Sequence, residues 1–483
     1  MKRYERHADD IAQLIRSGAL RPGNRVPSGR EASRTRGISP STVFEAYYLL
    51  EAQGLIHARP RSGYYVSARL HGTTEARPAE PQPSQPAVTS TEVAISDLVF
   101  EVLGLARDRD LVPLGSAFPG LELFPLERMA RCLASGMRKL DPWNIVQSLP
   151  PGDERLRQQI ALRYGVHGTA VDVEEIIITN GAMEALNLCL EAVTQPGDVV
   201  VVESPTFYAA LQALERLNLQ ALEIATHPRD GIDLAALAQA LERQTPQQPI
   251  KACWLMPSFQ NPLGSLMPEH KKRDLVALLA RHQVPLIEDD VYGELHFAPH
   301  RPPPAKAFDA EGLVMHCSSF SKCLAPGYRV GWVAAGRFAT AVQRLKLMTT
   351  LSAATPSQQA LSEYLAQGGY DRHLRALRRS LEQQQAIALW AVAQHFPPGT
   401  RVSRPEGGYF LWVELPPQVN ALELHRLALQ QGISLAPGQI FSADQRFAHC
   451  VRINYGHPAQ GRLAAALTTV GQLATGLATT VPE

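Results

Sequence analysis

One lysine, in the stretch SSFSKCLAPGYRVGW at residues 318–332, is of a type and in a setting that suggest covalent chemistry. The chain has 47 Lys and Arg residues but only eight lysines, so a lysine at this position stands out. A lysine amine with a lowered pKa can form an imine, whereas arginine stays protonated and cannot. Ser319 and Arg329 flank Lys322, and a hydroxyl with a guanidinium suits phosphate binding. The stretch suggests covalent capture of a phosphate-bearing aldehyde, although taken alone it fits an exposed surface lysine better.

Two further segments place an anion-binding helix terminus and an aromatic ring at strand ends. In ITNGAMEALNL a strand gives way to a helix, so the amides of Ala182 and Met183 face an anion at the helix N-terminus. In ESPTFYAAL, Phe207 comes just after the next strand, where its ring can cover a flat ligand. Plain core packing is the alternative for Phe207.

Two more segments supply polar side chains suited to a pyridine ring. SFQNPLG holds Asn261 in a proline-fixed turn, where it can donate to a phenolate oxygen. LIEDDVYGEL places Asp289 and Tyr292 after an apolar strand. A carboxylate at such a strand end is costly unless it is paired, and a protonated pyridine nitrogen is a suitable partner whose pKa the carboxylate would raise. The neighbouring Asp290 is expected to be solvated.

The body that must position these residues shows an α/β pattern. From about residue 95, short β-branched runs alternate with amphipathic helical stretches, which predicts a mostly parallel sheet covered by helices. A helical stretch over about 356–396 leads into a smaller α+β domain, which begins at about residue 370. The expected domains are 1–68, a proline-rich linker over 69–94, and a body over 95–483.

The N-terminal segment differs in charge from the rest of the chain. The first seventy residues hold twelve Lys and Arg against six Asp and Glu, whereas the whole chain has a formal net charge of only +1. This asymmetry suggests a module that binds a polyanion.

The same segment reads as helix, turn, helix and basic hairpin. Gly37 breaks the chain, Ser39 is placed as an N-cap and Pro40 as the first helical residue. The buried stripe of the second helix is expected to be Val43, Ala46, Tyr47 and Leu50. This pattern predicts a winged helix-turn-helix. The alternative is a capped surface helix with solvated arginines.

The stretch from GALRPGNRVPSGREAS to the hairpin RPRSGYYV resembles the GntR-type DNA-binding domain. The resemblance implies that Arg30 contacts phosphate or a base edge and that Gly63 lets the wing tip approach the minor groove. Many such domains carry a basic residue where this chain has Pro40, so the bases that are read stay open. The implied DNA-binding residues are Arg25, Ser28, Arg30, Ser41, Thr42, Arg59, Arg61 and Gly63.

The motifs GAMEAL, ESPTF, NPLG, EDDVY and SSFSKCLAPGYRVGW occur in the order found in fold-type I pyridoxal-phosphate aminotransferases. With the GntR-like head, the chain resembles MocR-type transcriptional regulators. The resemblance implies a seven-stranded-type sheet and pyridoxal 5'-phosphate as cofactor, with Lys322 as the Schiff-base lysine and Asp289 on the pyridine nitrogen. It places Asn261 and Tyr292 on the ring oxygen, Phe207 over the ring, and Ala182, Met183, Ser319 and Arg329 on the phosphate.

Two other positions matter for the comparison with aminotransferases. Arg452 in CVRINYGH matches the arginine that binds a substrate's α-carboxylate, and a structural arginine on an edge strand is the alternative. Gln147 stands at about the place where these enzymes often carry a tyrosine that reaches the partner subunit's phosphate.

Three functions are compatible with these patterns. The first is a regulator that binds DNA and senses the cofactor or its reaction with an amino acid or amine. The second is a working class I or II aminotransferase with an attached head. The third, a cofactor-free dimerisation scaffold, is disfavoured because Lys322 and Asp289 are both retained. A cytoplasmic protein is expected, because the six cysteines have no metal spacing and there is no signal peptide or membrane-length apolar run. The resemblance to aminotransferases implies a homodimer.

Overall fold

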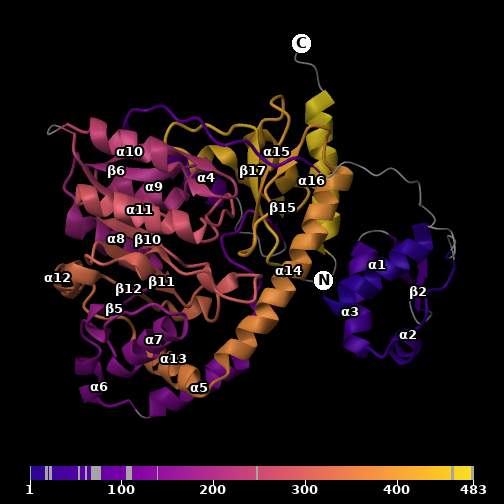
Figure 1. Ribbon diagram of the computed structural model, residues 1–483, viewed down its shortest axis with the longest axis horizontal. Helices are drawn as coiled ribbons and strands as arrows, with labels where there is room; N and C mark the ends of the chain where they lie inside the picture. The colour runs from indigo at the N-terminus through magenta and orange to yellow at the C-terminus, as the bar shows by residue number, and fades with distance from the viewer. Residues whose placement is uncertain are drawn as a thin grey trace.

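A computed structural model of the protein describes residues 2–16, 20, 24–52, 55–59, 63–66, 78–104, 111–138, 140–245, 248–457 and 462–479. Two parts are distinct in it: a small head, residues 2–66, and a large body, residues 78–479 (Figure 1). No helix in these described ranges combines the length and the apolar character needed to cross a membrane.

The head contains three helices and a two-stranded hairpin. They are α1 (Arg3–Arg16), α2 (Gly29–Arg36), α3 (Pro40–Ala52), β1 (Ile56–Arg59) and β2 (Gly63–Val66). Gly37 ends α2 in the left-handed region at φ 64°, and the Ser39 hydroxyl accepts a hydrogen bond from the Thr42 amide at 3.2 Å. The four residues predicted for the stripe on α3 are all buried in the head's own core. The predicted winged helix-turn-helix pattern is therefore confirmed.

The body begins with an extended segment that lies along its surface. The Ala79 carbonyl accepts a hydrogen bond from the Val402 amide, and the Thr226 amide donates to the Ser84 hydroxyl. The segment ends in β3 (Thr91–Glu92), which pairs with the edge strand β7. The C-terminal side of the segment expected as a linker over 69–94 is thus attached to the body, because an extended proline-rich chain can still pair with a sheet edge.

A nine-stranded sheet forms the centre of the body, in the order β3-β7-β6-β9-β10-β11-β12-β5 with β8 beside β7. Strands β7, β6, β9, β10 and β11 run parallel, and β12 is antiparallel between β11 and β5. The strands are β5 (Ile176–Thr179), β6 (Val199–Ser204), β7 (Gln220–His227), β8 (Gly231–Ile232), β9 (Ile250–Leu255), β10 (Leu286–Asp289), β11 (Val314–Ser319) and β12 (Gly331–Ala334). The mostly parallel sheet predicted from the sequence is confirmed.

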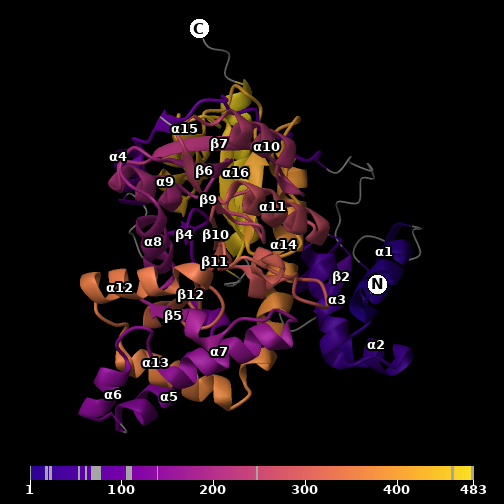
Figure 2. The ribbon, with the colours of Figure 1, turned by 60° about the vertical axis from the view of Figure 1, so that its left-hand side comes forward.

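Helices cover both faces of this sheet (Figures 1 and 2). Along β6, Val200 and Val202 belong to one apolar core while Val199 and Val201 belong to another, so both faces of the strand are buried. The helices of this part are α4 (Ser96–Gly104), α5 (Leu126–Arg138), α6 (Pro142–Gln147), α7 (Glu154–Val166), α8 (Ala182–Val193), α9 (Tyr208–Arg216), α10 (Leu234–Arg243), α11 (Glu269–His282), α12 (Ala339–Thr349) and α13 (Thr355–Ala366). Seven short 3-10 helices are also present among the described residues: η1 (Leu121–Leu123), η2 (Val173–Glu175), η3 (Gly293–Leu295), η4 (Ala305–Phe308), η5 (Pro326–Tyr328), η6 (Gly336–Phe338) and η7 (Gly438–Phe441).

The smaller C-terminal part is built on a four-stranded antiparallel sheet in the order β13-β14-β17-β16. Its elements are α14 (Tyr370–His395), β13 (Arg401–Val402), β14 (Phe410–Glu414), α15 (Ala421–Gln430), β15 (Ile433–Ser434), β16 (Ala436–Pro437), β17 (Cys450–Asn454) and α16 (Arg462–Thr479). Strand β4 (Val112–Pro113), far earlier in the chain, pairs with β15. The single helical stretch expected over about 356–396 is two helices, because the chain turns at Gly368 with φ 72°.

Helix α14 of the body contacts the head. It runs past α3 of the head in both views (Figures 1 and 2). Glu382 on α14 forms an ion pair with Lys2 at the start of the head.

Candidate cofactor site

A cavity of about 210 Å³ opens at the carboxyl ends of the parallel strands. It brings together eight of the ten residues predicted for the body's site: Ala182, Met183, Phe207, Asp289, Tyr292, Ser319, Lys322 and Arg329. They converge because β5, β6, β10 and β11 all end at the same edge of the sheet, and the side chains after each strand therefore share one space. Asn261 and Arg452 are not among the residues that line it.

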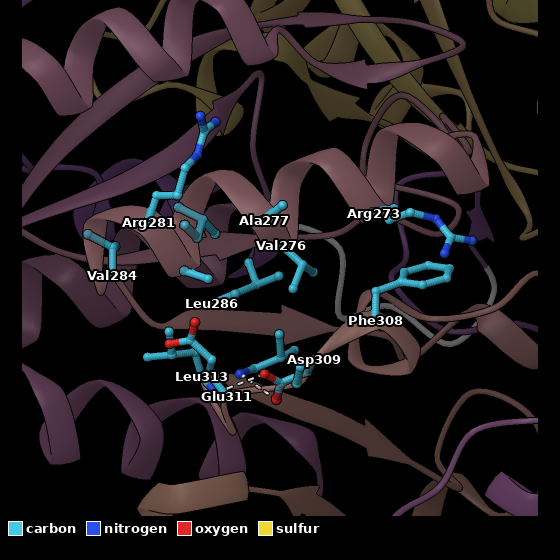
Figure 3. A pocket seen from close by; sticks show the side chains of 14 residues that line it. Arg273, Val276, Ala277, Arg281, Val284, Leu286, Phe308, Asp309, Glu311 and Leu313 are labelled. Atoms are coloured by element: carbon cyan, nitrogen blue, oxygen red, sulfur yellow. Dashed lines mark hydrogen bonds between the residues drawn. The ribbon is translucent and has the colours of Figure 1, made fainter.

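A second, larger cavity of about 360 Å³ lies between α11 and the start of β11 (Figure 3). Its lining is mainly apolar and includes Val276, Leu286 and Phe308. None of the predicted site residues lines it, so its size does not make it the candidate site.

Lys322 lies in the wall of the first cavity, where its side chain contacts Ala117 and Phe118 in the segment between β4 and η1. Its Nζ donates to the Ala117 carbonyl at 2.7 Å and lies 3.7 Å from the centre of the Phe118 ring. Burial lowers its pKa to about 7, and the charges of Arg452 and Arg329 add to this effect against the opposing charge of Asp289. A large share of the amine is therefore neutral, and nucleophilic, near pH 7.

This pKa predicts how covalent attachment of an aldehyde depends on pH. Because only the neutral amine attacks, the attachment rate in the cofactor-free protein should rise with pH and level off above about 7, rather than above the ordinary lysine value of about 10.4. Stopped-flow absorbance after mixing with the aldehyde measures this profile. A rate still climbing steeply from pH 8 to 10 would contradict the lowered pKa.

Asp289 and Asn261 form the polar end of the site. Burial, and secondarily the neighbouring Asp290, raise the pKa of Asp289 to about 7. Among the described residues, Oδ1 of Asp289 and Nδ2 of Asn261 have no hydrogen-bond partner although both are buried. An unpaired acceptor and an unpaired donor in a dry site suit a ligand with a protonated nitrogen and an oxygen acceptor.

Asp290 is not the solvated neighbour that was expected. Its side chain is buried and pairs with Arg301 and with His316. The two consecutive acids point to opposite sides of a sheet that is covered on both faces, so neither reaches solvent.

The opposite end of the cavity is an anion cradle. The N-terminal turn of α8 begins after Gly181, whose φ is +82° and at which a Cβ atom would lie 2.5 Å from Nη2 of Arg329. Nη1 of that arginine donates to the Ser321 hydroxyl at 3.4 Å. Free amides at a helix start, hydroxyls and a guanidinium together suit a phosphate group.

Aromatic rings border the space between these two ends. Phe207 lies on the cavity wall, with its ring centre 4.9 Å from that of Tyr208. Tyr292 is fully buried, which raises its pKa, and it packs edge-on against Tyr409 at 5.4 Å. A flat ligand held between an acid and an anion cradle would lie among these rings.

Arg452 is fully buried and already bonded on both terminal nitrogens. Nη1 donates to Oδ1 of Asn261 at 3.0 Å, and Nη2 donates to the Gly115 carbonyl at 2.6 Å. Its guanidinium also lies 4.3 Å from the Phe410 ring centre. The carboxylate-binding role expected of Arg452 is untested by this arrangement, in which the arginine orients Asn261.

Sequence reasoning missed several residues of the cavity. They are Ala117, Phe118, Leu186, Tyr208, Ala209, Met256, Val291 and Ser321. Ser321 and Tyr208 adjoin residues that were predicted, so their positions next to Lys322 and Phe207 were the available signal. Nothing local marked Phe118, which reaches the cavity through long-range pairing of its segment with the small domain.

The predicted DNA-binding residues of the head that the structure describes lie at the starts of α2 and α3 and beside the hairpin. Ser41 and Thr42 lie in the first turn of α3, and both hydroxyls are 2.8 Å from that of Ser39. Arg25 lies against Gly63 of the hairpin, where φ is +104° and a side chain would be strained. Ser28 caps α2 through the Glu31 amide, and Arg30 is exposed in its first turn. Arg61 and the side chain of Arg59 lie outside the described residues.

Comparison with known families agrees with this geometry. The family model for aminotransferase class I and II matches residues 132–467, and the model for bacterial regulatory proteins of the gntR family matches residues 3–66. The chain belongs to the aminotransferase class I and II family. Its GntR-type DNA-binding head gives this aminotransferase-family protein the architecture of MocR-type regulators, as the resemblance predicted.

Similar proteins include regulators and enzymes. The HTH-type transcriptional regulator YdcR of Escherichia coli K12 is 48% identical over 454 residues, which cover 94% of this chain and 95% of that protein. The 2-aminoadipate transaminase of Thermus thermophilus is 31% identical over 387 residues, covering 78% of this chain and 94% of the enzyme. The regulator therefore matches head and body together, while the enzyme covers a smaller share of this chain.

A solved structure supports the cofactor assignment. The α-aminoadipate aminotransferase LysN of Thermus thermophilus, in complex with N-(5'-phosphopyridoxyl)-L-leucine, superposes with a TM-score of 0.72 at 28% identity, covering 80% of this chain and all of that chain. The cavity fits such a group, because the unpaired acid, the unpaired amide and the anion cradle match its ring nitrogen, ring oxygen and phosphate. The cofactor of this aminotransferase-family chain is pyridoxal 5'-phosphate.

Proposed function

We propose that the protein is a transcriptional regulator that binds an operator through its head and senses an amino acid or amine through pyridoxal phosphate in its body. The observation that carries this is that a buried lysine, in a cavity whose lining residues suit pyridoxal phosphate, shares one chain with a GntR-type head. A metabolic aminotransferase has no need of the head. The regulator relatives, which match both parts, support the same function.

Each residue of the site has its own role in the proposed sensing. Bound pyridoxal phosphate supplies an aldehyde that reacts with amines and a ring that withdraws electrons from the atoms attached to it. Asp289 would hold a proton at the ring nitrogen, and Asn261 would donate to the ring oxygen. Lys322 would hold the cofactor until an incoming amine replaces it, and its neutral amine can then take or return a proton. Arg452 is the candidate partner for the carboxylate of an amino acid.

Helix α14 offers a physical route from this reaction to the head. In its first turn, Tyr370 Oη lies 3.0 Å from Sγ of Cys323, and His373 Nε2 lies 2.7 Å from the Cys323 carbonyl. Cys323 directly follows Lys322. The same helix reaches the head through Glu382 and α3. Release of the lysine would thus act on an element that contacts the head, and a coupling of about 1–3 kcal/mol would change DNA affinity about 5–150-fold.

We also propose that the protein acts as a homodimer. Several large apolar side chains are exposed on the body, among them Trp143, Ile145 and Val146 on α6 and Met348 on α12. Monomeric proteins rarely expose large contiguous apolar patches, and the neighbouring apolar side chains of α6 suit contact with a second copy of the chain, the partner that the aminotransferase family suggests. Gln147, at the exposed end of α6, would then face the partner without the hydroxyl of a tyrosine.

The test follows colour and DNA affinity in one titration. Amino acids and amines are added to the cofactor-loaded protein bound to its upstream DNA, and the visible band should shift over the same concentrations that change DNA affinity. Arg30→Ala should weaken DNA binding about tenfold and reduce its salt dependence by about one phosphate contact, leaving the colour unchanged. Spectral shifts without any change in DNA affinity would contradict sensing. Unaltered DNA binding by Arg30→Ala would remove the role assigned to that residue.

Aminotransferase activity is the second candidate. The combination of Lys322 and Asp289 in one cavity, and the similarity to a transaminase, favour it. Multiple-turnover formation of a keto acid from an amino acid and a second keto acid would establish this activity. A single spectral change without turnover would support the sensing function only.

A further inference from the structure

Asp290, next to the acid that faces the cavity, is tied to strand β11 at three points. Its amide donates to the Cys317 carbonyl at 2.9 Å, and its own carbonyl accepts from the Ser318 hydroxyl at 2.9 Å. Its carboxylate accepts from Nε2 of His316 at 3.0 Å. Three consecutive residues of β11 therefore hold one residue at the end of β10.

This link lies between the two strand ends that a bound cofactor must bridge. Strand β10 ends at Asp289, which would hold the ring nitrogen, and β11 ends at Ser319, three residues before Lys322. The distance between the acid and the lysine therefore depends on how firmly these two strand ends are joined. Asp290 joins them from the opposite face of the sheet.

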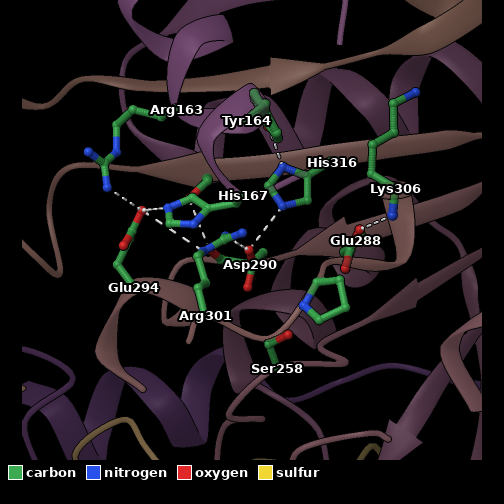
Figure 4. Close-up of polar contacts among 12 residues, drawn as sticks. Arg163, Tyr164, His167, Ser258, Glu288, Asp290, Glu294, Arg301, Lys306 and His316 are labelled. Atoms are coloured by element: carbon green, nitrogen blue, oxygen red, sulfur yellow. Dashed lines mark hydrogen bonds and ion pairs between the residues drawn. The ribbon is translucent and has the colours of Figure 1, made fainter. Parts of the chain in front are cut away.

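A chain of hydrogen bonds continues from Asp290 away from the cavity (Figure 4). Trp332 Nε1 donates to the Tyr164 hydroxyl at 3.0 Å, and that hydroxyl lies 2.6 Å from Nδ1 of His316. Because the ionised carboxylate of Asp290 can only accept, Nε2 of His316 carries a proton. The Tyr164 hydroxyl, which accepts from Trp332, can then donate to Nδ1. All three bonds therefore run in one direction and end on the carboxylate.

Charged groups around Asp290 keep it ionised. Burial by itself would raise its pKa, but Arg301 and the hydrogen bond from His316, helped by Lys272, hold the pKa below its usual value. Arg301 also lies 3.9 Å from Glu294 of η3, the 3-10 helix that directly follows Tyr292. One guanidinium thus supports the segments that carry both Asp289 and Tyr292.

We propose that Asp290, with His316, Tyr164 and Arg301, is a positioning unit that sets the placement and the ionisation of Asp289 toward the cofactor. None of the four lines the cavity, so they act through Asp289 and not on the cofactor directly. The inference rests on the cofactor assignment and deepens the proposed function of the same site.

The experiment compares the full-length Asp290→Asn and Tyr164→Phe variants with the wild type. Asp290→Asn keeps the shape and both backbone bonds but removes the charge, so pyridoxal phosphate should bind about tenfold more weakly. The pKa read from the visible band of the bound cofactor should fall by about half a unit, because a nearby negative charge that favours protonation is lost. Tyr164→Phe removes one oxygen and frees the tautomer of His316, so cofactor binding should weaken about threefold.

The matched control is Asp309→Asn, another buried carboxylate that pairs with a cation, Lys306, beside the second cavity (Figure 3). It should lower the melting temperature but leave cofactor affinity within about twofold and the visible-band pKa unchanged. The proposal is overturned if the folded Asp290→Asn and Tyr164→Phe variants bind and titrate like the wild type, or if Asp309→Asn shifts both readings equally. If Asp290→Asn does not fold, the cofactor affinity and visible-band pKa of Tyr164→Phe decide whether the proposal stands. A wild type that binds no pyridoxal phosphate would instead defeat the proposed function itself.

Discussion

Lys322→Ala is expected to abolish the visible absorbance of the bound cofactor and to leave no borohydride-fixed adduct on the peptide around position 322. Lys322 is the one lysine among the residues that line the cavity, and alanine cannot form an imine. The variant should still bind DNA, because the head has its own apolar core, but amines should no longer change its DNA affinity. Absorbance spectra, peptide mass spectrometry after borohydride reduction and DNA titrations measure the three effects.

The control for this substitution is Lys251→Ala, at an exposed position on β9. It should keep the colour, the adduct and the response to amines. Retained colour in Lys322→Ala, or an adduct on another lysine, would show that the covalent site has been placed on the wrong residue.

Asp289→Asn is expected to weaken cofactor binding about 10–100-fold and to slow the reaction of the bound cofactor with amines. Burial, and then the charge of Asp290, raise the pKa of Asp289 to about 7, so its ionised form depends on a cationic partner in the cavity. A protonated ring nitrogen provides that cation, and a hydrogen bond between charged groups contributes about 1.5–3 kcal/mol. Asparagine has nearly the same shape but cannot balance the charge.

Two measurements check this expectation. Equilibrium dialysis gives the cofactor affinity, and the rate of spectral change after addition of an amino acid gives the reactivity. Asp309→Asn again serves as the buried-acid control and should change neither. Wild-type values in Asp289→Asn would mean that another group protonates the ring, and the polar end of the site would have to be reassigned.

Much of the candidate site was predictable because its residues follow strand ends directly. Lys322, Asp289 and Phe207 each lie within a few residues of a parallel strand, and the geometry of such a sheet brings those ends together. The helix-turn-helix was equally predictable, because Gly37 ends α2 and Ser39 caps α3 through contacts with residues close to them in the sequence.

The remaining features depend on partners that are distant in the sequence. Two adjacent acids after an apolar strand suggest one buried and one solvated side chain, and only the fold shows that Arg301 and His316 lie on the other face and pair with Asp290. Phe118 reaches Lys322 because its segment joins the small domain through β4. No local pattern of residue types encodes either contact.

The attachment of the segment from Pro78 to β3 along the body has a consequence for the spacing of operator half-sites. From the end of β2 at Val66 to Pro78 the chain can span at most about 40 Å, whereas an unattached connection up to residue 95 could span about 100 Å. In a homodimer each head could therefore lie only within a limited distance of Pro78, where its own chain joins the body. The two half-sites of the operator should therefore have a restricted separation. Lengthening the connection after Val66 should allow other separations, but it should reduce the gain in DNA affinity that comes from binding both half-sites at once.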